Sequence, residues 1–293
     1  MFYITGDTHG NFSRIEHFCE EVLRASRTET GASGEGASVV ASTLSSEAAS
    51  SAAVSTVAPA SPASPASPTS SAPLVTAPPH TSQAVDDVMI ILGDAGLNFY
   101  GGFRDRYKKE RLSRLPLTIF SIHGNHEMRP GTIASYHLMD WRGGKVYVED
   151  DFPNLLFAVD GEIYDFDGIQ TIVIGGAYSV DKFYRLANNY GWWPDEQLSP
   201  AIKEKVERVL ADRGWAVDVV LSHTTPLKYE PVEVFLPSID QSKVDKSTET
   251  WLDGIEDRLT YKHWYCGHYH VDKDVDCLSI MFQAIREFGA PEV

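Results

Sequence analysis

The sequence predicts an α/β fold in which short apolar strands alternate with helices. Two observations support this prediction. Short apolar segments recur along the chain with amphipathic helical segments between them, and several of the apolar segments end directly at a cluster of Asp, Asn or His. In open α/β sheets, ligands bind beyond the carboxyl ends of the strands, so these clusters are expected to meet at one site.

The first predicted elements are a strand and a helix. The strand covers Phe2–Thr5 and is followed at once by the motif GDTHG at residues 6–10. A helix is predicted over residues 11–25, because apolar side chains recur there every three to four residues. These side chains are Phe12, Ile15, Phe18, Val22 and Leu23.

Residues 26–83 differ sharply in composition from the rest of the chain. They are almost entirely Ala, Ser, Thr, Pro, Gly and Val, and they include the repeat SPASPASP at residues 61–68. So few large apolar side chains would not offset the entropy cost of ordering this segment. We therefore predict a single domain over residues 1–293, interrupted by a disordered insertion at about 26–83. A passive expansion is favoured over a regulatory docking segment.

The strand and helix pattern resumes after the insertion. Strands are predicted at Val88–Leu92, Leu117–Ile122, Lys145–Val148, Leu155–Val159, Glu162–Phe166, Thr171–Gly175, Val217–Leu221 and His263–Cys266. Helices are predicted near Arg104–Ser113, Pro200–Asp212 and Ser247–Leu259. The dipeptides Asp160-Gly161 and Asp167-Gly168 each separate two predicted strands, and Asp-Gly is a strong hairpin signal.

The charge of the chain limits its partners. With 25 Lys and Arg against 41 Asp and Glu, the net charge is −16, which argues against a general nucleic-acid binder. A phosphate site in such an acidic protein needs its own positive charge, and bound metal ions would supply it. We expect a small-molecule or phosphorylated substrate, no nucleic-acid partner and no membrane, and leave the oligomeric state open.

Cysteine usage and the first residues predict the compartment. The three cysteines form no CxxC pair, as expected in a reducing environment. The first residues show no basic region followed by a long apolar run, and no apolar stretch is long enough for a membrane span. The expectation is a cytoplasmic protein.

The residues after the strands are suited to binding metal. Asp7 and His9 are two positions apart, as are His268 and His270, and such pairs point the same way in an extended segment. Imidazole, carboxylate and amide donors together suit Mn, Fe or Zn better than Ca or Mg. Seven donors are too many for one ion, which argues against a mononuclear enzyme. The remaining candidate donors are Asp94, whose carboxylate could bridge two ions, Asn125 and His223.

Five motifs, in this order, resemble those of the calcineurin-like metallophosphoesterase superfamily. They are GDTH at residues 6–9, GD at 93–94, GNHE at 124–127, SH at 222–223 and GHYH at 267–270. Each follows a predicted strand, and together they span nearly all of the chain outside the insertion.

The resemblance implies a fold, a ligand set and a reaction. The fold would be a two-sheet β-sandwich flanked by helices, in four αββα layers. A hydroxide bridging two metal ions would attack a phosphomonoester or phosphodiester in line, and His126 would stabilise or protonate the leaving group. By resemblance, the first metal would be held by Asp7, His9 and His270, the second by Asn125, His223 and His268, and both by Asp94.

The sequence departs from the protein-phosphatase branch of that superfamily. Two arginines expected near the bridging carboxylate and before GNHE are absent, as is the carboxylate expected to orient His126. Three basic residues are candidate substrate contacts in their place: Arg129, Lys182 and Arg185. The last two follow a further predicted strand, in or just after the cluster GGAYSVDK at residues 175–182.

Two other functions remain as alternatives to a hydrolase. One is a non-catalytic scaffold that keeps the fold, although no candidate ligand is missing here. The other is a nuclease of the same superfamily, against which the acidic charge argues.

Overall fold

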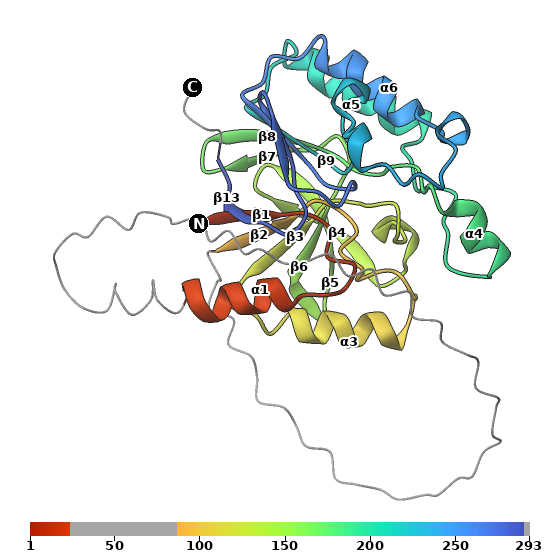
Figure 1. Ribbon diagram of the computed structural model, residues 1–293. Helices are drawn as coiled ribbons and strands as arrows, with labels where there is room; N and C mark the ends of the chain where they lie inside the picture. Colours follow the sequence, from red (N-terminus) through yellow and green to blue (C-terminus); the bar gives the residue numbers. More distant parts are fainter. Residues whose placement is uncertain (24–86, 290–293) are drawn as a thin grey trace, which may run out of the picture. The chain divides into compact units, whose positions relative to one another are not determined.

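The computed structural model describes residues 1–23 and 87–289, which form two stacked β-sheets between two layers of helices (Figure 1). This arrangement confirms the predicted αββα sandwich. The insertion predicted at 26–83 lies outside the described residues, as does the predicted end of the first helix.

Within the described residues, the larger sheet has seven strands in the order β13-β1-β2-β3-β6-β5-β4. The four neighbours β1, β2, β3 and β6 run parallel, and β13, β5 and β4 pair antiparallel at the two sides. The strands are β1 (Phe2–Thr5), β2 (Val88–Ile91), β3 (Thr118–Ser121), β4 (Tyr136–Trp141), β5 (Gly144–Glu149), β6 (Phe152–Ala158) and β13 (Ile285–Glu287).

The smaller sheet has six strands in the described part of the chain, in the order β11-β12-β10-β9-β8-β7. Its central strands β12, β10, β9 and β8 are parallel, and antiparallel β11 and β7 form the edges. The strands are β7 (Ile163–Phe166), β8 (Ile169–Ile174), β9 (Val219–Ser222), β10 (His263–Cys266), β11 (Lys273–Val275) and β12 (Leu278–Ile280).

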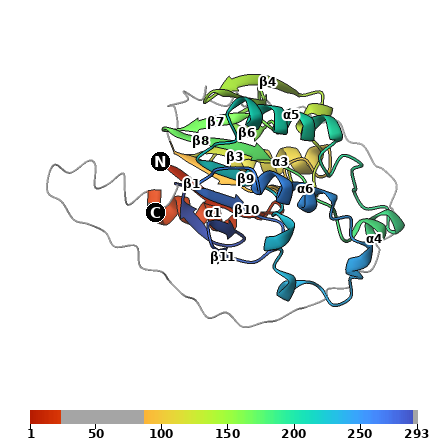
Figure 2. The same ribbon diagram turned by 90° about the horizontal axis from the view of Figure 1, so that it is seen from above.

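Helices cover the outer faces of the sandwich. Figure 1 shows α1 and α3 on the side of the larger sheet and α5 and α6 on the opposite side, and Figure 2 shows α6 next to β9 of the smaller sheet. Ser199 and Pro200 start α5 well, since the Ser199 hydroxyl caps the helix and proline suits its first position. The helices are α1 (Ser13–Phe18), continued by a π-turn at Cys19–Leu23, α3 (Phe103–Leu112), α4 (Lys182–Ala187), α5 (Pro200–Asp212) and α6 (Ser247–Glu256). Short 3-10 helices lie at Pro130–Thr132, Leu227–Tyr229, Val232–Val234 and Gln241–Lys243.

Strand alternation explains why both faces of each sheet are apolar. In β2, Met89 and Ile91 pack toward the helical layer with Phe12 of the first loop, while Ile90 packs into the space between the sheets. The smaller sheet follows the same rule, with a separate cluster joining it to α5 and α6. Because both faces of each sheet are apolar, the polar residues that follow the strands lie at the strand ends rather than within the layers.

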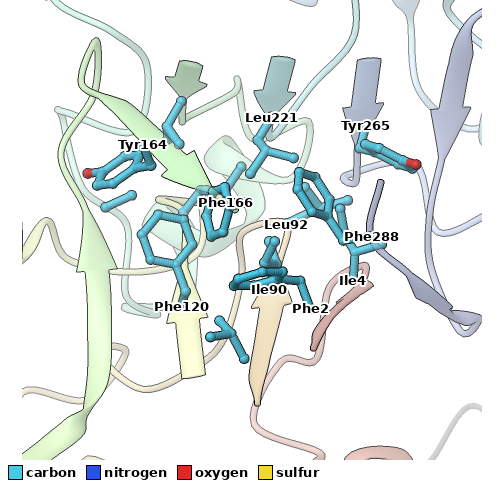
Figure 3. Packing of buried hydrophobic residues seen from close by; sticks show 14 of the residues in the cluster. Phe2, Ile4, Ile90, Leu92, Phe120, Tyr164, Phe166, Leu221, Tyr265 and Phe288 are labelled. Atoms are coloured by element: carbon cyan, nitrogen blue, oxygen red, sulfur yellow. The ribbon is translucent and has the colours of Figure 1, made fainter. Parts of the chain in front are cut away.

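Aromatic and aliphatic side chains fill the space between the sheets (Figure 3). Phe166 of the smaller sheet lies at their centre. Its ring centroid is 5.2 Å from those of Phe2 and Phe288, 5.6 Å from that of Phe120 and 5.9 Å from that of Trp141. These contacts are edge-to-face, which is a favourable aromatic geometry. This packing fixes the distance between the two sheets that carry the site.

One of the two predicted hairpins is confirmed and the other is wrong. Asp167 and Gly168 both have positive φ and connect antiparallel β7 and β8. Asp160-Gly161 instead carries the chain from the larger sheet to the smaller one, because β6 and β7 belong to different sheets. The Asp160 carboxylate accepts hydrogen bonds from the Gly175 backbone and the Arg129 guanidinium, which hold this crossing in place.

The remaining strands and helices were predicted within a few residues, but several elements were not predicted. The strand at Tyr136–Trp141 is an edge strand whose side chains are largely exposed, so it lacks an apolar pattern. The short strands β11, β12 and β13 and the helix α4 were missed as well. Among the described residues, none of the helices is long and apolar enough to cross a bilayer.

We expect Phe166→Ala to lower the free energy of unfolding by about 3–5 kcal/mol, because it leaves a cavity between the sheets. Chemical denaturation would measure the change. Phe103→Ala is the matched control, since the Phe103 side chain is 83% exposed at the start of α3. The control should change stability by no more than about 0.5 kcal/mol. Equal effects of the two substitutions would contradict this account of the core.

Candidate metal centre

The carboxyl ends of five parallel strands meet between the two sheets. Asp7, Asp94 and Asn125 follow β1, β2 and β3, while His223 and His268 follow β9 and β10. Hydrogen bonds join the sheets here, two of them close to Asp7 and Asp94. The His268 backbone N–H donates to Asp7 Oδ1 at 3.0 Å, and His223 Nδ1 lies 2.8 Å from the Leu92 carbonyl. The predicted convergence of distant motifs on one crevice is therefore observed.

One cluster contains Asp7, His9 and His270. His270 Nε2 lies 2.9 Å from His9 Nε2 and 3.3 Å from Asp7 Oδ2, and His9 Nε2 lies 3.8 Å from the same oxygen. Asp7 Oδ2 is buried and accepts no hydrogen bond from the described residues. Burial opposes ionisation of this carboxyl, but the neighbouring histidines, led by His223, hold its pKa well below the usual range. The cluster therefore presents an ionised oxygen and two ring nitrogens to a common point.

The other cluster is centred on Asn125. Its Oδ1 lies 2.8 Å from His223 Nε2 and 3.1 Å from His268 Nδ1. The Asn125 amide nitrogen donates to Ser179 Oγ at 2.8 Å, which keeps the oxygen directed at the histidines. Since His223 Nδ1 donates to a backbone carbonyl, its Nε2 lone pair is available to bind a metal. Burial, and then His223, lower the pKa of His268 to about 3, so its ring is neutral as a ligand must be.

Asp94 lies between the two clusters. Its Oδ2 is 3.9 Å from His9 Nδ1, 3.8 Å from His223 Nε2 and 3.6 Å from His126 Nδ1. Its Oδ1 accepts a hydrogen bond from the His126 backbone N–H at 2.8 Å. One carboxylate oxygen is thus fixed by the backbone, and the other faces histidines from both clusters. This is the position that a bridging ligand would need.

The backbone around the site is strained. His9, Asp94, His268 and His270 all have φ between 47° and 70°, in the left-handed region that non-glycine residues rarely adopt. Each such residue costs on the order of 1–3 kcal/mol and is held by its surroundings. Gly267 also allows a close approach, because a Cβ atom there would lie 2.3 Å from Asp7 Oδ1. The left-handed conformations lower the local stability at these positions, and they set the direction of the side chains.

The residues fit a metal ion. Each of the groups Asp7, His9 and His270; His9, Asp94 and His126; and Asp7, Asp94 and His223 offers ligand atoms within 4.8 Å of one another. A buried carboxylate oxygen without a donor is costly, and a cation would compensate it. In the bond between His9 and His270 only one ring nitrogen can carry the hydrogen, whereas a cation accepts both lone pairs. Imidazole, carboxylate and amide donors suit Mn, Fe or Zn.

His126 lies beside the clusters and contacts two residues of the α4 segment. Its Nε2 is 3.5 Å from Asp181 Oδ1, and its Nδ1 is 3.2 Å from Arg185 Nη2. Arg185 Nε donates to Asp181 Oδ2 at 2.7 Å, which connects the three side chains. Burial lowers the pKa of His126, but the contacts with Asp181 and Asp94 outweigh it, and the net direction is upward.

The carboxylate expected from the protein-phosphatase branch is absent from the motif segments, but another carboxylate lies beside His126. Asp181 lies next to it, supplied by the loop after β8 rather than by the segment after Asp94. The cluster at residues 175–182 contains Asp181, but the contact with His126 depends on the path of the loop after β8. Arg185, predicted there as a substrate contact, does reach the site.

Comparison with known proteins now identifies the family. Residues 76–272, more than half of the chain, match the model of the calcineurin-like phosphoesterases. The chain belongs to the calcineurin-like phosphoesterase family. The crystal structure of TT1561 of Thermus thermophilus aligns with a TM-score of 0.42 and 11% identity, over 96% of this chain and 87% of that chain. This likeness is too weak to support any argument, and no curated protein matches the sequence.

Family membership and geometry agree on the centre. Calcineurin-like phosphoesterases typically bind divalent metals, and the clusters supply possible ligands. The matched range includes Asp94 and His270 but ends short of Asp7 and His9 on the N-terminal side. Parallel pairing of β1 with β2 brings these two residues to the same centre, since Thr5 pairs with Ile91.

The other two predicted substrate contacts lie differently. Arg129 Nε donates to the Asp195 carbonyl at 2.8 Å, and its Nη1 bonds the Asp160 carboxylate at 2.5 Å. Arg129 therefore stabilises the segment at Asp160, where the chain passes from the larger sheet to the smaller one. Lys182 Nζ lies over the Trp192 ring, 4.2 Å from its centroid, as a cation–π contact. Neither side chain belongs to the ligand clusters of the described residues.

Glu127 is a further buried group that sequence reasoning did not single out. Its Oε1 accepts from the Gly124 backbone N–H at 3.2 Å, while Oε2 has no partner among the described residues. Burial, and then the nearby Asp94 charge, raise the pKa of Glu127 to about 8. This direction favours the protonated side chain, which avoids a second negative charge near Asp94.

We expect Gly267→Ala to weaken binding of Mn²⁺ about tenfold or more, because the new Cβ would displace the Asp7 carboxylate. Titration calorimetry would measure the affinity. Gly254→Ala is the control, since a Cβ there meets no atom within 4 Å. An unchanged affinity in Gly267→Ala would contradict the placement of Asp7 in the centre.

Proposed function

We propose that this calcineurin-like phosphoesterase hydrolyses a phosphomonoester or phosphodiester at a two-metal centre. The observation that carries the proposal is the pair of ligand clusters with Asp94 between them and His126 alongside. The proposed ligands are Asp7, His9 and His270 for one ion and Asn125, His223 and His268 for the other, with Asp94 shared. When bound, such a metal pair acidifies water and polarises phosphoryl oxygens.

The His126 ring would serve the leaving group. In the neutral ring, Nδ1 accepts from the Arg185 guanidinium while Nε2–H faces Asp181. In the protonated ring, Nδ1–H and the guanidinium both direct donors toward the same space. An anionic substrate oxygen would accept from both, and the leaving oxygen would take the Nδ1 proton. Asp181 would balance the ring's positive charge and fix its orientation.

Arg185 would replace a phosphate-binding arginine absent from the motifs. Its side chain is 13% exposed and already held by Asp181 at 2.7 Å and by the Gly191 carbonyl at 3.1 Å. A guanidinium fixed in this way loses little entropy when it binds a phosphoryl oxygen. The acidic chain thus keeps a local positive charge beside the proposed metals.

We expect Asn125→Ala to lose bound metal and His126→Ala to retain it while kcat falls by about 10²–10⁴-fold. The reason is that Asn125 contacts two proposed ligands, whereas His126 would act on the leaving group. Elemental analysis and rates on a panel of mono- and diesters would test both, with chelator-treated protein as the reference. Unchanged turnover in both variants would rule out this site.

We expect Arg185→Ala and Asp181→Asn to lower kcat by about 10–100-fold, because each holds or assists His126. Arg185→Ala should also raise KM, and this rise in KM should be smaller in Arg185→Lys. Arg106→Ala is the control, since it removes a similar but exposed ion pair, between Arg106 of α3 and Asp151 at 2.8 Å. A loss of activity in the control as large as in the other variants would indicate a structural effect instead.

A further inference from the structure

A pocket of about 420 Å³ extends from the proposed metal centre along the segment between β9 and α6. The lining includes five residues of the proposed centre: Asp94, Asn125, His126, His268 and His270. It also includes six apolar or aromatic side chains, which we call the apolar arm: Val234, Phe235, Leu236, Ile239, Val244 and Tyr269.

The apolar arm is shaped by aromatic stacking and remains partly open to water. The rings of Phe235 and Tyr269 stack with centroids 6.2 Å apart and planes 17° from parallel. Tyr269 lies between His268 and His270 in the sequence, so this stack is tied directly to the proposed ligands. Val234 and Leu236 are 40% and 60% exposed. A group bound here would cover apolar surface that now contacts solvent.

Three carboxyl groups that line the pocket, other than that of Asp94, each have a polar partner. Glu230 forms an ion pair with Lys246 at 2.6 Å, and Asp181 pairs with Arg185. Glu249 accepts from Thr224 Oγ1 at 2.8 Å, and burial raises its pKa to about 7. None of the described residues lining this pocket is Lys or Arg. Lys246 Nζ lies 5.0 Å from the Phe235 ring centroid, but it is already paired with Glu230. An anionic group away from the centre would therefore compete with Glu230 for this cation and would lie near glutamates.

We propose that the apolar arm binds the alcohol part of the substrate and selects an uncharged, apolar group, such as an aryl group. The inference rests on the proposed function. In the reaction, a water oxygen bonds to phosphorus, the P–O bond to the alcohol breaks, and the alcohol oxygen takes a proton. The phosphoryl group would lie at the metal end, beside His126, and the alcohol would extend along the Phe235–Tyr269 stack. Phosphopeptides rich in acidic residues and polyphosphate esters would be poor substrates.

The test uses the full chain loaded with Mn²⁺ and three aryl phosphates with leaving phenols of matched acidity, each also as its methyl diester. The aryl groups are phenyl, 2-naphthyl and 4-carboxyphenyl. We expect kcat/KM to be about tenfold higher for naphthyl than for phenyl esters, and about tenfold lower for carboxyphenyl esters. Equal or better turnover of the carboxyphenyl ester would overturn the inference.

Two substitutions in one segment distinguish an effect on the apolar arm from a general effect of a new surface charge. Leu236→Asp places a charge in the arm at a position exposed enough to leave the fold intact, and it should abolish the naphthyl preference. Val232→Asp makes a similar change at a site that is 66% exposed and outside the pocket lining, and it should retain that preference. Identical behaviour of the two variants would overturn the inference.

Binding of the non-hydrolysable naphthyl and carboxyphenyl phosphonates, measured by titration calorimetry, tests the arm independently of turnover. In one outcome no ester is hydrolysed, but the naphthyl phosphonate binds about tenfold more tightly than the carboxyphenyl phosphonate and loses that advantage in Leu236→Asp. This outcome would contradict the proposed reaction and support the apolar arm. If esters are hydrolysed but the two phosphonates bind equally, the arm fails and the proposed reaction stands.

Discussion

The structure depends on burying two carboxylates, Asp7 and Asp94, at the ends of neighbouring strands. Their side chains are 1% and 2% exposed, and within the described residues their ion-pair partners are histidines rather than Lys or Arg. Burying a charge is costly unless it is compensated. One oxygen of each accepts a backbone N–H, from His268 and His126 respectively, and the other is left facing histidines. The fold thus buries the negative charges of two carboxylates, and neutral imidazole rings alone compensate these charges poorly.

Much of the surrounding geometry follows from that requirement. The β1–β2–β3 pairing sets Asp7, Asp94 and Asn125 side by side, and the aromatic core holds the other sheet, with His223 and His268, at the right distance. The left-handed backbone at four of the site residues turns their side chains inward. Such strain is stable only in a rigid frame, which the closely packed space between the sheets provides.

Each proposed ligand could be named from the sequence because it follows closely after a short apolar strand. In a parallel sheet, that position alone determines where the side chain lies, and no long-range information is needed. Asp181 could not be assigned in the same way, because it lies well beyond the end of β8 and reaches His126 only through the path of a loop. Asp160-Gly161 misled for a related reason. A local turn signal says that the chain reverses, but not which sheet receives the next strand.

The two ligand clusters differ in their access to water. His9 and His270 have 36% and 47% of their side-chain surface exposed, whereas His223 is fully buried. The His223 tautomer is set by a backbone carbonyl, while the rings of His9 and His270 hydrogen-bond to each other. The Asn125 side is therefore the more preorganised of the two. Asn125, His268 and His270 line the pocket, and His9 and His270 of the Asp7 side reach the surface. Asp94 is shared by the two clusters and couples them. A cation bound at one cluster would lower the free-energy cost of burying the Asp94 carboxylate, which links binding at the two clusters.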